Sequence, residues 1–216
     1  MKYDMSGAAA VTGAVLALAK REAPVNAVAV AALVENMPSP MAQRPGDVRE
    51  TMSGKTIEVI NTDAEGRLIL SDAIWYAQEE FEPKLVVDVA TLTGSVKVAL
   101  GVHYAGLFSR QDDVVEELLA AGAASGEDVW RLPLHPKFFE IIKSDIADVK
   151  NSVEGGQGGA SIGAAFIGTF VKPDTRWAHL DIAGRAWAFE PNATTPKGAA
   201  GWGVRLLNQL VLDSYQ

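Results

Sequence analysis

The stretch of residues 61–68, with the sequence NTDAEGRL, constrains the fold most because it joins two segments of different periodicity. Residues 56–60 before it form a short β-branched run that is typical of a strand, and residues 68–77 after it carry apolar side chains at helical spacing. The stretch is therefore predicted to be a strand-to-helix loop. In open α/β sheets such loops lie outside the carboxyl ends of the strands, where ligands bind.

Three charged side chains lie close together in this loop. Asp63 and Glu65 are two positions apart, and Arg67 follows them. Two carboxylates at this spacing can direct their oxygens into one cavity, where they repel each other unless a cation lies between them. The alternative is structural: Asp63 caps the next helix, Glu65 complements its dipole and Arg67 is a solvated surface charge. Spacing alone leaves both interpretations open.

The composition is that of an α/β protein. We expect one domain over residues 1–216, since this length suffices to bury a substantial core. Hydrophobic residues make up 48% of the chain and charged residues 21%, which disfavours both disorder and a membrane span. The first residues carry an early acid and no signal-peptide cleavage pattern, so we expect a cytoplasmic protein with no membrane partner.

Cysteine is absent and the net charge is negative. Without cysteine, the chain forms no disulfide or thiolate metal site, so any metal is held by oxygen or nitrogen. The formal net charge of -8 disfavours a nucleic-acid partner, because phosphate backbones bind basic surfaces. It is compatible with a cationic ligand such as the α-ammonium group of a peptide.

Predicted strands and helices alternate along the rest of the chain. Helices are expected over residues 6–21, 68–81, 112–124, 160–171 and 197–215, and strands over residues 25–34, 84–92, 105–109, 129–134 and 177–184. The near-continuous apolar run 25–34 is predicted to be a buried parallel strand. The glycine-rich stretch around residue 156 lacks a preceding strand and a following Lys-Ser/Thr, so we exclude a nucleotide site there.

The loop at residues 61–68, continued by Ile69, Leu70 and Asp72, resembles the signature of the leucine aminopeptidase family, which are two-metal exopeptidases. The run ATLTG at 90–94 resembles the second signature of that family, and residues 1–10, 36–38, 45–47 and 177–184 are similar as well. The resemblance covers nearly all of the chain. It implies a three-layer α/β/α fold with a mixed, mostly parallel central sheet of the zinc-peptidase-like kind.

The resemblance also implies a site and its chemistry. Asp4, Asp63 and Glu65 would bind two divalent metal ions, with Glu65 as the bridge, and the ions would be Mn²⁺, Zn²⁺ or Mg²⁺. Arg67 would be catalytic and hold a bicarbonate that acts as general base. The substrates would be peptides with a free N-terminus and a leucine-like first residue. Substrate-binding positions would be Met1, Asn61, Thr91, Leu92, Gly94 and Ala183.

The chain departs from the family pattern at its start. Family members carry a metal-binding lysine, a metal-binding aspartate, a second catalytic lysine and a separate domain before the segment that residues 1–10 resemble. This chain begins at Met1, so the resemblance implies weakened metal binding and catalysis. The alternative is a non-catalytic assembly or regulatory subunit, and in either case we expect a homo-oligomer, which is a hexamer in the family. A phosphoester hydrolase is disfavoured, since no phosphate-cradling loop is present.

Overall fold

A mixed sheet of four strands forms the centre of the molecule. The computed structural model describes residues 3–155 and 157–216. The strand order is β3 (Val86–Ala90), β7 (Trp177–Asp181), β4 (Ala105–Ser109) and β5 (Val129–Arg131). The pairs β3–β7 and β4–β5 are parallel and β4–β7 is antiparallel, which confirms the prediction of a mixed, mostly parallel sheet.

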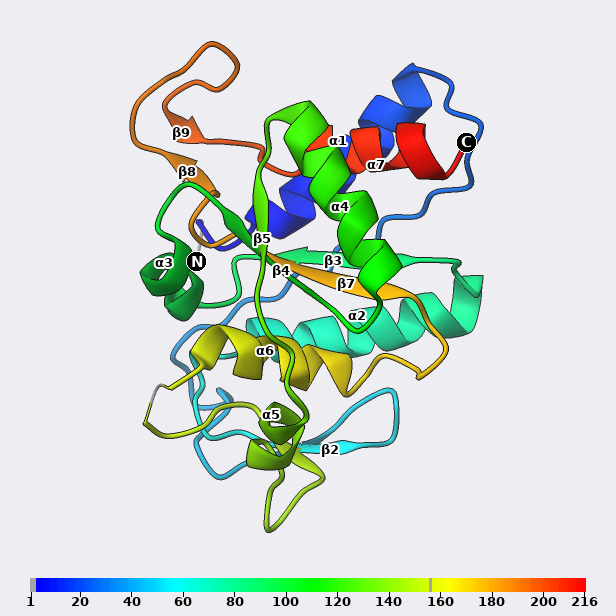
Figure 1. Ribbon diagram of the computed structural model, residues 1–216. Helices are drawn as coiled ribbons and strands as arrows, with labels where there is room; N and C mark the ends of the chain where they lie inside the picture. The colour runs from blue at the N-terminus through cyan, green and yellow to red at the C-terminus, as the bar shows by residue number, and fades with distance from the viewer. Residues whose placement is uncertain (1–2, 156) are drawn as a thin grey trace.

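Helices cover both faces of this sheet (Figure 1). Helices α1 (Ser6–Lys20), α4 (Asp112–Ser125) and α7 (Val204–Ser214) pack on one face, and α2 (Gly66–Phe81), α3 (Gly94–Leu100) and α6 (Gly159–Gly168) on the other. Leu180 of β7 joins the first core, and Trp177 of the same strand joins the second. Successive side chains of a strand point to opposite faces, so one strand supplies both cores. The three-layer architecture agrees with the prediction.

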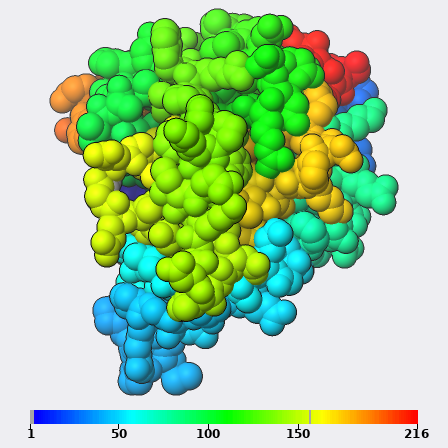
Figure 2. Space-filling model, turned by 60° about the horizontal axis from the view of Figure 1, so that its bottom comes forward, coloured from blue at the N-terminus to red at the C-terminus, as the bar shows by residue number. Residues whose placement is uncertain are grey.

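A smaller sheet lies beyond α6. It has the order β1 (Val48–Glu50), β2 (Thr56–Glu58) and β6 (Val149–Lys150), and the short helix α5 (Pro136–Ile141) lies beside it (Figure 1). Residues 40–60 stand out as a projection at the lower end of the molecule (Figure 2). The pairing of β2 with β6 brings residues 149–151 next to the stretch that leads into the 61–68 loop.

The last helix is shorter than predicted. It begins at Val204, whereas the apolar spacing predicted a helix from residue 197. Gly198, Gly201 and Gly203 have φ values of 115°, 60° and 101°, which a right-handed helix does not contain. The chain instead forms β9 (Gly198–Ala199), which pairs with β8 (Trp187–Ala188).

The prediction of a buried strand at residues 25–34 is wrong. The segment runs in extended form but pairs with no strand of the described chain, and none of its residues is buried. Val28, Leu33 and Val34 are at least half exposed. A β-branched run forms a strand only beside a hydrogen-bonding partner. The outer edge of β3 pairs with no strand of residues 3–155 and 157–216 either, and a cavity separates it from this segment.

Within residues 3–155 and 157–216, no helix is both long and apolar enough to cross a membrane.

Candidate active site

The carboxyl ends of β3 and β7 lie side by side and bring together the loops that follow them. The backbone N–H of Ile182 donates to the carbonyl of Ala90 at 2.8 Å. Asp181, at the end of β7, then binds both loops. One of its carboxylate oxygens accepts hydrogen bonds from the N–H groups of Leu92 and Ala183 at 3.1 and 3.2 Å, and the other accepts from the hydroxyl of Thr93 at 2.7 Å.

Asp181 is fully buried, and so is His179, two residues earlier on β7. His179 is within hydrogen-bonding distance of Asp88 at 2.6 Å, and the indole N–H of Trp177 donates to the other oxygen of Asp88 at 2.7 Å. Burial favours a lower pKa for His179, but the charge of Asp88, its hydrogen bond and the charge of Asp181 raise that pKa above 6.5. Burial raises the pKa of Asp181, and the His179 charge opposes this rise.

Asn151 holds the 61–68 loop in place, although it comes from beyond β6. Its side chain is completely buried, and its oxygen accepts from the N–H groups of Ile60 and Asn61 at 2.8 and 3.2 Å. Its amide donates to the carbonyl of Asn61 at 2.7 Å and to that of Ala64 at 3.3 Å. The Asn61 side chain accepts from the N–H of Asp63 at 2.9 Å, which tightens the same turn.

Glu65 is the N-cap residue of α2, but its carboxylate does not cap the helix. Oε2 of Glu65 is buried and accepts no hydrogen bond from any residue that the structure describes. Burial raises the pKa of Glu65 above 4.5, its own backbone N–H opposes this, and the charges of Asp4 and Asp63 raise the pKa further. The charges of Asp4 and Asp63 therefore disfavour the ionised form of Glu65, and its Oε2 is available to a cation.

Arg67 lies two residues further on, in the first turn of α2, and is 8% exposed. Its Nη1 donates to the carbonyl of Asn151 at 2.7 Å, while Nε is buried without an acceptor. Burial lowers the pKa of Arg67 to about 10, against the opposing charges of Asp181 and Glu65. The guanidinium is still charged at neutral pH, so its free Nε–H is a donor for an anion.

Asp4 reaches the site from the other side, just before α1. The hydroxyl of Thr91 donates to its Oδ1, which ties Asp4 to the carboxyl end of β3. Helix α1 approaches β3 closely at Gly7, where an added Cβ would collide with the carbonyl oxygen of Val89. A glycine is therefore needed at this contact. The close approach of α1 to β3 keeps Asp4 near the carboxyl end of that strand.

One large cavity contains these side chains. It has a volume of about 1870 Å³ and lies between the outer edge of β3, helices α1 and α2, the end of α7 and residues 24–37. Of the residues predicted for the site, it is lined by Asp4, Asp63, Glu65, Arg67, Thr91, Leu92 and Gly94. In the part of the chain that the structure describes, no three Asp, Glu or His side chains lie close enough together to hold one metal ion.

The other predicted residues are placed differently. Asn61 and Ala183 are not among the residues that line this cavity: Asn61 is used in the turn before Glu65, and Ala183 is held by Asp181. Met1 lies outside the described residues. The cavity therefore contains the carboxylates and the 91–94 loop, while Asn61 and Ala183 belong to its supporting structure.

Sequence reasoning missed three residues that build the site. Asn36 donates to the carbonyl of Thr62 at 2.9 Å, which links the 24–37 segment to the loop, and its side chain also lowers the pKa of Glu65. Asn151 and Asp181 were not predicted to have these roles. Asp181 carried a signal, because a carboxylate and a histidine alternate with apolar residues along β7. Asn36 carried one as well, since residues 36–38 resemble the family, whereas Asn151 carried none.

Comparison with known proteins agrees with these features. A model of the catalytic domain of the cytosol aminopeptidase family matches residues 1–208. The chain is 54% identical over 217 residues to a probable cytosol aminopeptidase of Rickettsia bellii and 56% identical over 218 residues to one of Caulobacter vibrioides. These alignments cover all of this chain but only 43% and 44% of the relatives, so the chain spans less than half of their length.

A solved structure gives the same result. A tomato leucine aminopeptidase mutant is similar in fold with a TM-score of 0.88 and 44% sequence identity, over 98% of this chain and 41% of that one. The family model, the identity to the relatives and the shared fold agree, and the chain belongs to the cytosol aminopeptidase family.

Proposed function

We propose that this chain carries part of the site of a metal-dependent aminopeptidase that releases N-terminal, preferably leucine-like residues from peptides in the cytoplasm. The observation that supports this most is the arrangement around Glu65. Its buried Oε2 has no partner, and Asp4 and Asp63 add their charges to the same cavity. A cluster of repelling carboxylates beside a free oxygen is the environment that a divalent cation stabilises.

The donor set fits hard divalent cations. Glu65, Asp4 and Asp63 offer only oxygen, which suits Mn²⁺, Mg²⁺ or Zn²⁺ in a chain without cysteine. Glu65 would bridge two ions, with Asp63 on one and Asp4 on the other. When bound, the ions would polarise the scissile carbonyl, activate water and anchor the free α-amine of the peptide.

Arg67 would orient the proton acceptor of the reaction. Its Nε–H has no acceptor among the described residues, and the guanidinium can offer a planar pair of donors to an anion such as bicarbonate. The carbonyl of Asn151 holds Nη1 at 2.7 Å, so the guanidinium plane is fixed before any ligand binds. Such preorganisation reduces the cost of ordering in the transition state.

The 91–94 loop would bind the substrate. Thr93 and the N–H of Leu92 are held by Asp181, so the carbonyl of Leu92 has a fixed position from which to accept from the peptide amine. Gly94 allows a ligand to approach the backbone. Met1 would contact the first side chain of the peptide, and Asn61 and Ala183 would position the substrate through the loops that they support.

The remaining ligands would come from polypeptide that fills the cavity. The outer edge of β3 and the extended segment 25–34 both lack a partner strand, and the cavity lies between them. An extended segment in this space would pair with both, which is the usual way of covering an exposed edge. We propose that such a segment supplies the lysine and aspartate that the family resemblance implies, and that the assembly is a homo-oligomer.

A second candidate is a non-catalytic subunit with the aminopeptidase fold. It is favoured by one observation: in residues 3–155 and 157–216, no three metal-binding side chains share a position for one ion. In that case the carboxylates would bind no catalytic metal, and the chain would act by binding other subunits.

Hydrolysis of leucine-p-nitroanilide with added Mn²⁺ separates the two candidates. The chain is assayed alone and mixed with the polypeptide that precedes the matched region in the Caulobacter vibrioides relative. We expect turnover in the mixture, its loss in Glu65→Ala, and no effect of Glu116→Ala, which changes an exposed carboxylate on α4. If neither sample exceeds the Glu65→Ala background, the aminopeptidase proposal is wrong and the non-catalytic role is favoured.

A further inference from the structure

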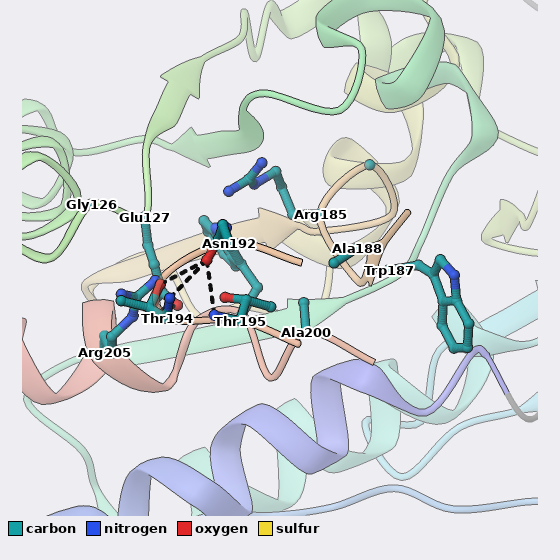
Figure 3. Close-up of a pocket in the computed structure, with 12 residues that line it drawn as sticks. Gly126, Glu127, Arg185, Trp187, Ala188, Asn192, Thr194, Thr195, Ala200 and Arg205 are labelled. Atoms are coloured by element: carbon teal, nitrogen blue, oxygen red, sulfur yellow. Dashed lines mark hydrogen bonds and ion pairs between the residues drawn. The ribbon is translucent and has the colours of Figure 1, made fainter. Parts of the chain in front are cut away.

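A second pocket lies between the turn after β7, the 192–195 turn and the start of α7. Its volume is about 260 Å³, and its lining residues include Glu127, Arg185, Asn192, Trp202 and Arg205. It shares no lining residue with the large cavity. Figure 3 shows Arg185 reaching over Asn192, with Glu127 and Arg205 on one side.

Glu127, the acidic residue of this pocket, already has its partners. It is 2% exposed, and its Oε2 accepts from the backbone N–H groups of Gly203 and Leu206 at 3.0 and 2.8 Å. Its other oxygen accepts from Nε of Arg205 at 3.4 Å. The carboxylate thus stabilises the N-terminal end of α7, and it forms no ion pair with Arg185 in the described chain.

Two donors of the pocket residues have no acceptor. The indole N–H of Trp202, which is 3% exposed, and Nε of Arg185 are both buried without a hydrogen-bond partner among the described residues. Nη1 of Arg185 donates to the carbonyl of Val102 at 2.6 Å, which fixes the guanidinium. Buried donors without acceptors are rare in proteins, and each raises the question of a missing ligand.

The local charge also favours an anion of low charge. Burial lowers the pKa of Arg185, and the charges of Glu127 and Asp128 oppose this, although neither is within ion-pair distance in the described chain. Two guanidinium groups line the pocket against one carboxylate. The nearby acids would repel a dianion more strongly than a monoanion.

We propose that this pocket binds a small monocarboxylate, held by the Nε–Nη2 edge of Arg185 and the indole N–H of Trp202. The edge of a guanidinium presents two parallel donors that match the two oxygens of a carboxylate. The amide group of Asn192 supplies a further donor, because its oxygen is already used by the N–H groups of Thr194 and Thr195 at 2.9 and 2.8 Å. The volume lies below the usual range for larger ligands, which selects a small acid.

Titration of the full chain with sodium propionate, at ionic strength held constant with NaCl, tests this proposal. The readout is the Trp202 indole N–H resonance in ¹H–¹⁵N spectra, assigned with Trp202→Phe. We expect a saturable downfield shift of this signal, and a loss of affinity of about tenfold or more in Arg185→Gln. Arg131→Gln is the matched control, since Arg131 pairs with Asp112 outside the pocket.

Further measurements distinguish loss of the binding site from loss of the fold. The other indole resonances and the thermal midpoint report whether Arg185→Gln is folded, and Arg185→Lys, which lacks the planar pair of donors, should be weakened as well. The proposal is overturned if the Trp202 signal does not move, if it moves equally in folded Arg185→Gln, or if inorganic phosphate binds more tightly than propionate. No outcome depends on aminopeptidase activity.

Discussion

The two edges of β3 differ in how completely they are paired. On the inner edge, β7 forms hydrogen bonds with β3 and β4, and all five of its residues are buried. On the outer edge, β3 faces the large cavity, and the 25–34 segment beyond it pairs with no strand of the described residues. The difference indicates that the inner edge of β3 is stabilised by strands of this chain, whereas the outer edge requires a further polypeptide segment to pair with it.

Polar side chains on β7 and in the large cavity follow a similar division, with one exception on β7. Around β7, the carboxylates of Asp88 and Asp181 accept hydrogen bonds from residues of the chain itself. In the cavity, Glu65 and Arg67 each have a buried atom without a partner. The exception is Nε2 of His179, which is buried without an acceptor while its ring stacks on Phe108.

A proline scan of the two strands should show the largest difference. Leu180 is fully buried and its strand is paired on both sides, so Leu180→Pro removes a ladder hydrogen bond and core packing at once. We expect it to lower the free energy of unfolding by more than about 4 kcal/mol, enough to prevent folding. Circular dichroism and urea unfolding measure the effect.

The matched change on the outer edge is Val87→Pro. The N–H of Val86 donates toward β7 at 2.9 Å, and since successive residues of a strand alternate, the N–H of Val87 points to the open edge. We expect a loss of only about 1–2 kcal/mol. A loss equal to that of Leu180→Pro would show that the edge is not open.

The next largest effect is expected at the buried pair behind Asp181. Asp88→Ala leaves His179 and the indole N–H of Trp177 without their acceptor in a dry environment. We expect the free energy of unfolding to fall by about 3–5 kcal/mol, because a buried charge loses its partner. Asp145→Ala, at an exposed carboxylate, is the control and should change it by less than about 0.5 kcal/mol. Equal effects of the two changes would contradict this account.

A smaller effect is expected at Thr93, which links the β7 side to the loop over the cavity. Its hydroxyl donates to Asp181 at 2.7 Å and accepts from the N–H of Val96 at 3.1 Å as the N-cap of α3. Thr93→Val should cost about 1–2 kcal/mol, and Thr93→Ser should recover most of it. Amide hydrogen exchange at Leu92 and Val96 would show whether the loop itself loosens, and unchanged exchange in Thr93→Val would contradict the proposed link.

The sequence predicted the elements whose partners lie within the chain. The strand at residues 105–109 was predicted with its observed bounds, because both strands that pair with it, β7 and β5, belong to this chain. The segment 25–34 is richer in β-branched residues than β4 but was predicted wrongly, since local pattern does not reveal whether a partner strand is present. The acidic residues of the cavity came from the resemblance of a short motif. The roles of Asn151 and Asp181 could not be predicted from a local motif, because each side chain hydrogen-bonds to residues about 90 positions away in the sequence.

The smallest expected effect concerns Glu65 and depends on pH. Its folded pKa is raised above 4.5 by burial and by its acidic neighbours, so ionisation opposes folding. Below pH 4.5 the folded and unfolded states are both protonated and there is no penalty, whereas the penalty develops as pH rises through the folded pKa. Because the side chain is half-exposed, Glu65→Gln should stabilise the protein by only about 0.5 kcal/mol at pH 7.5, or roughly 1–2 °C in Tm, and not at pH 4.

Calorimetry of Glu65→Gln, with Glu116→Gln as the exposed control, measures this difference at the two pH values. Excess Mn²⁺ should then reverse the order at pH 7.5, because an ion that binds the ionised Glu65 stabilises the wild-type chain by mass action and the Gln variant less. A Tm of Glu65→Gln equal to or below that of the wild type at pH 7.5 without metal would mean that the carboxylate already has a partner inside the chain. In that case Glu65 would behave like Asp88 and Asp181, and the two edges of β3 would not differ in the way proposed.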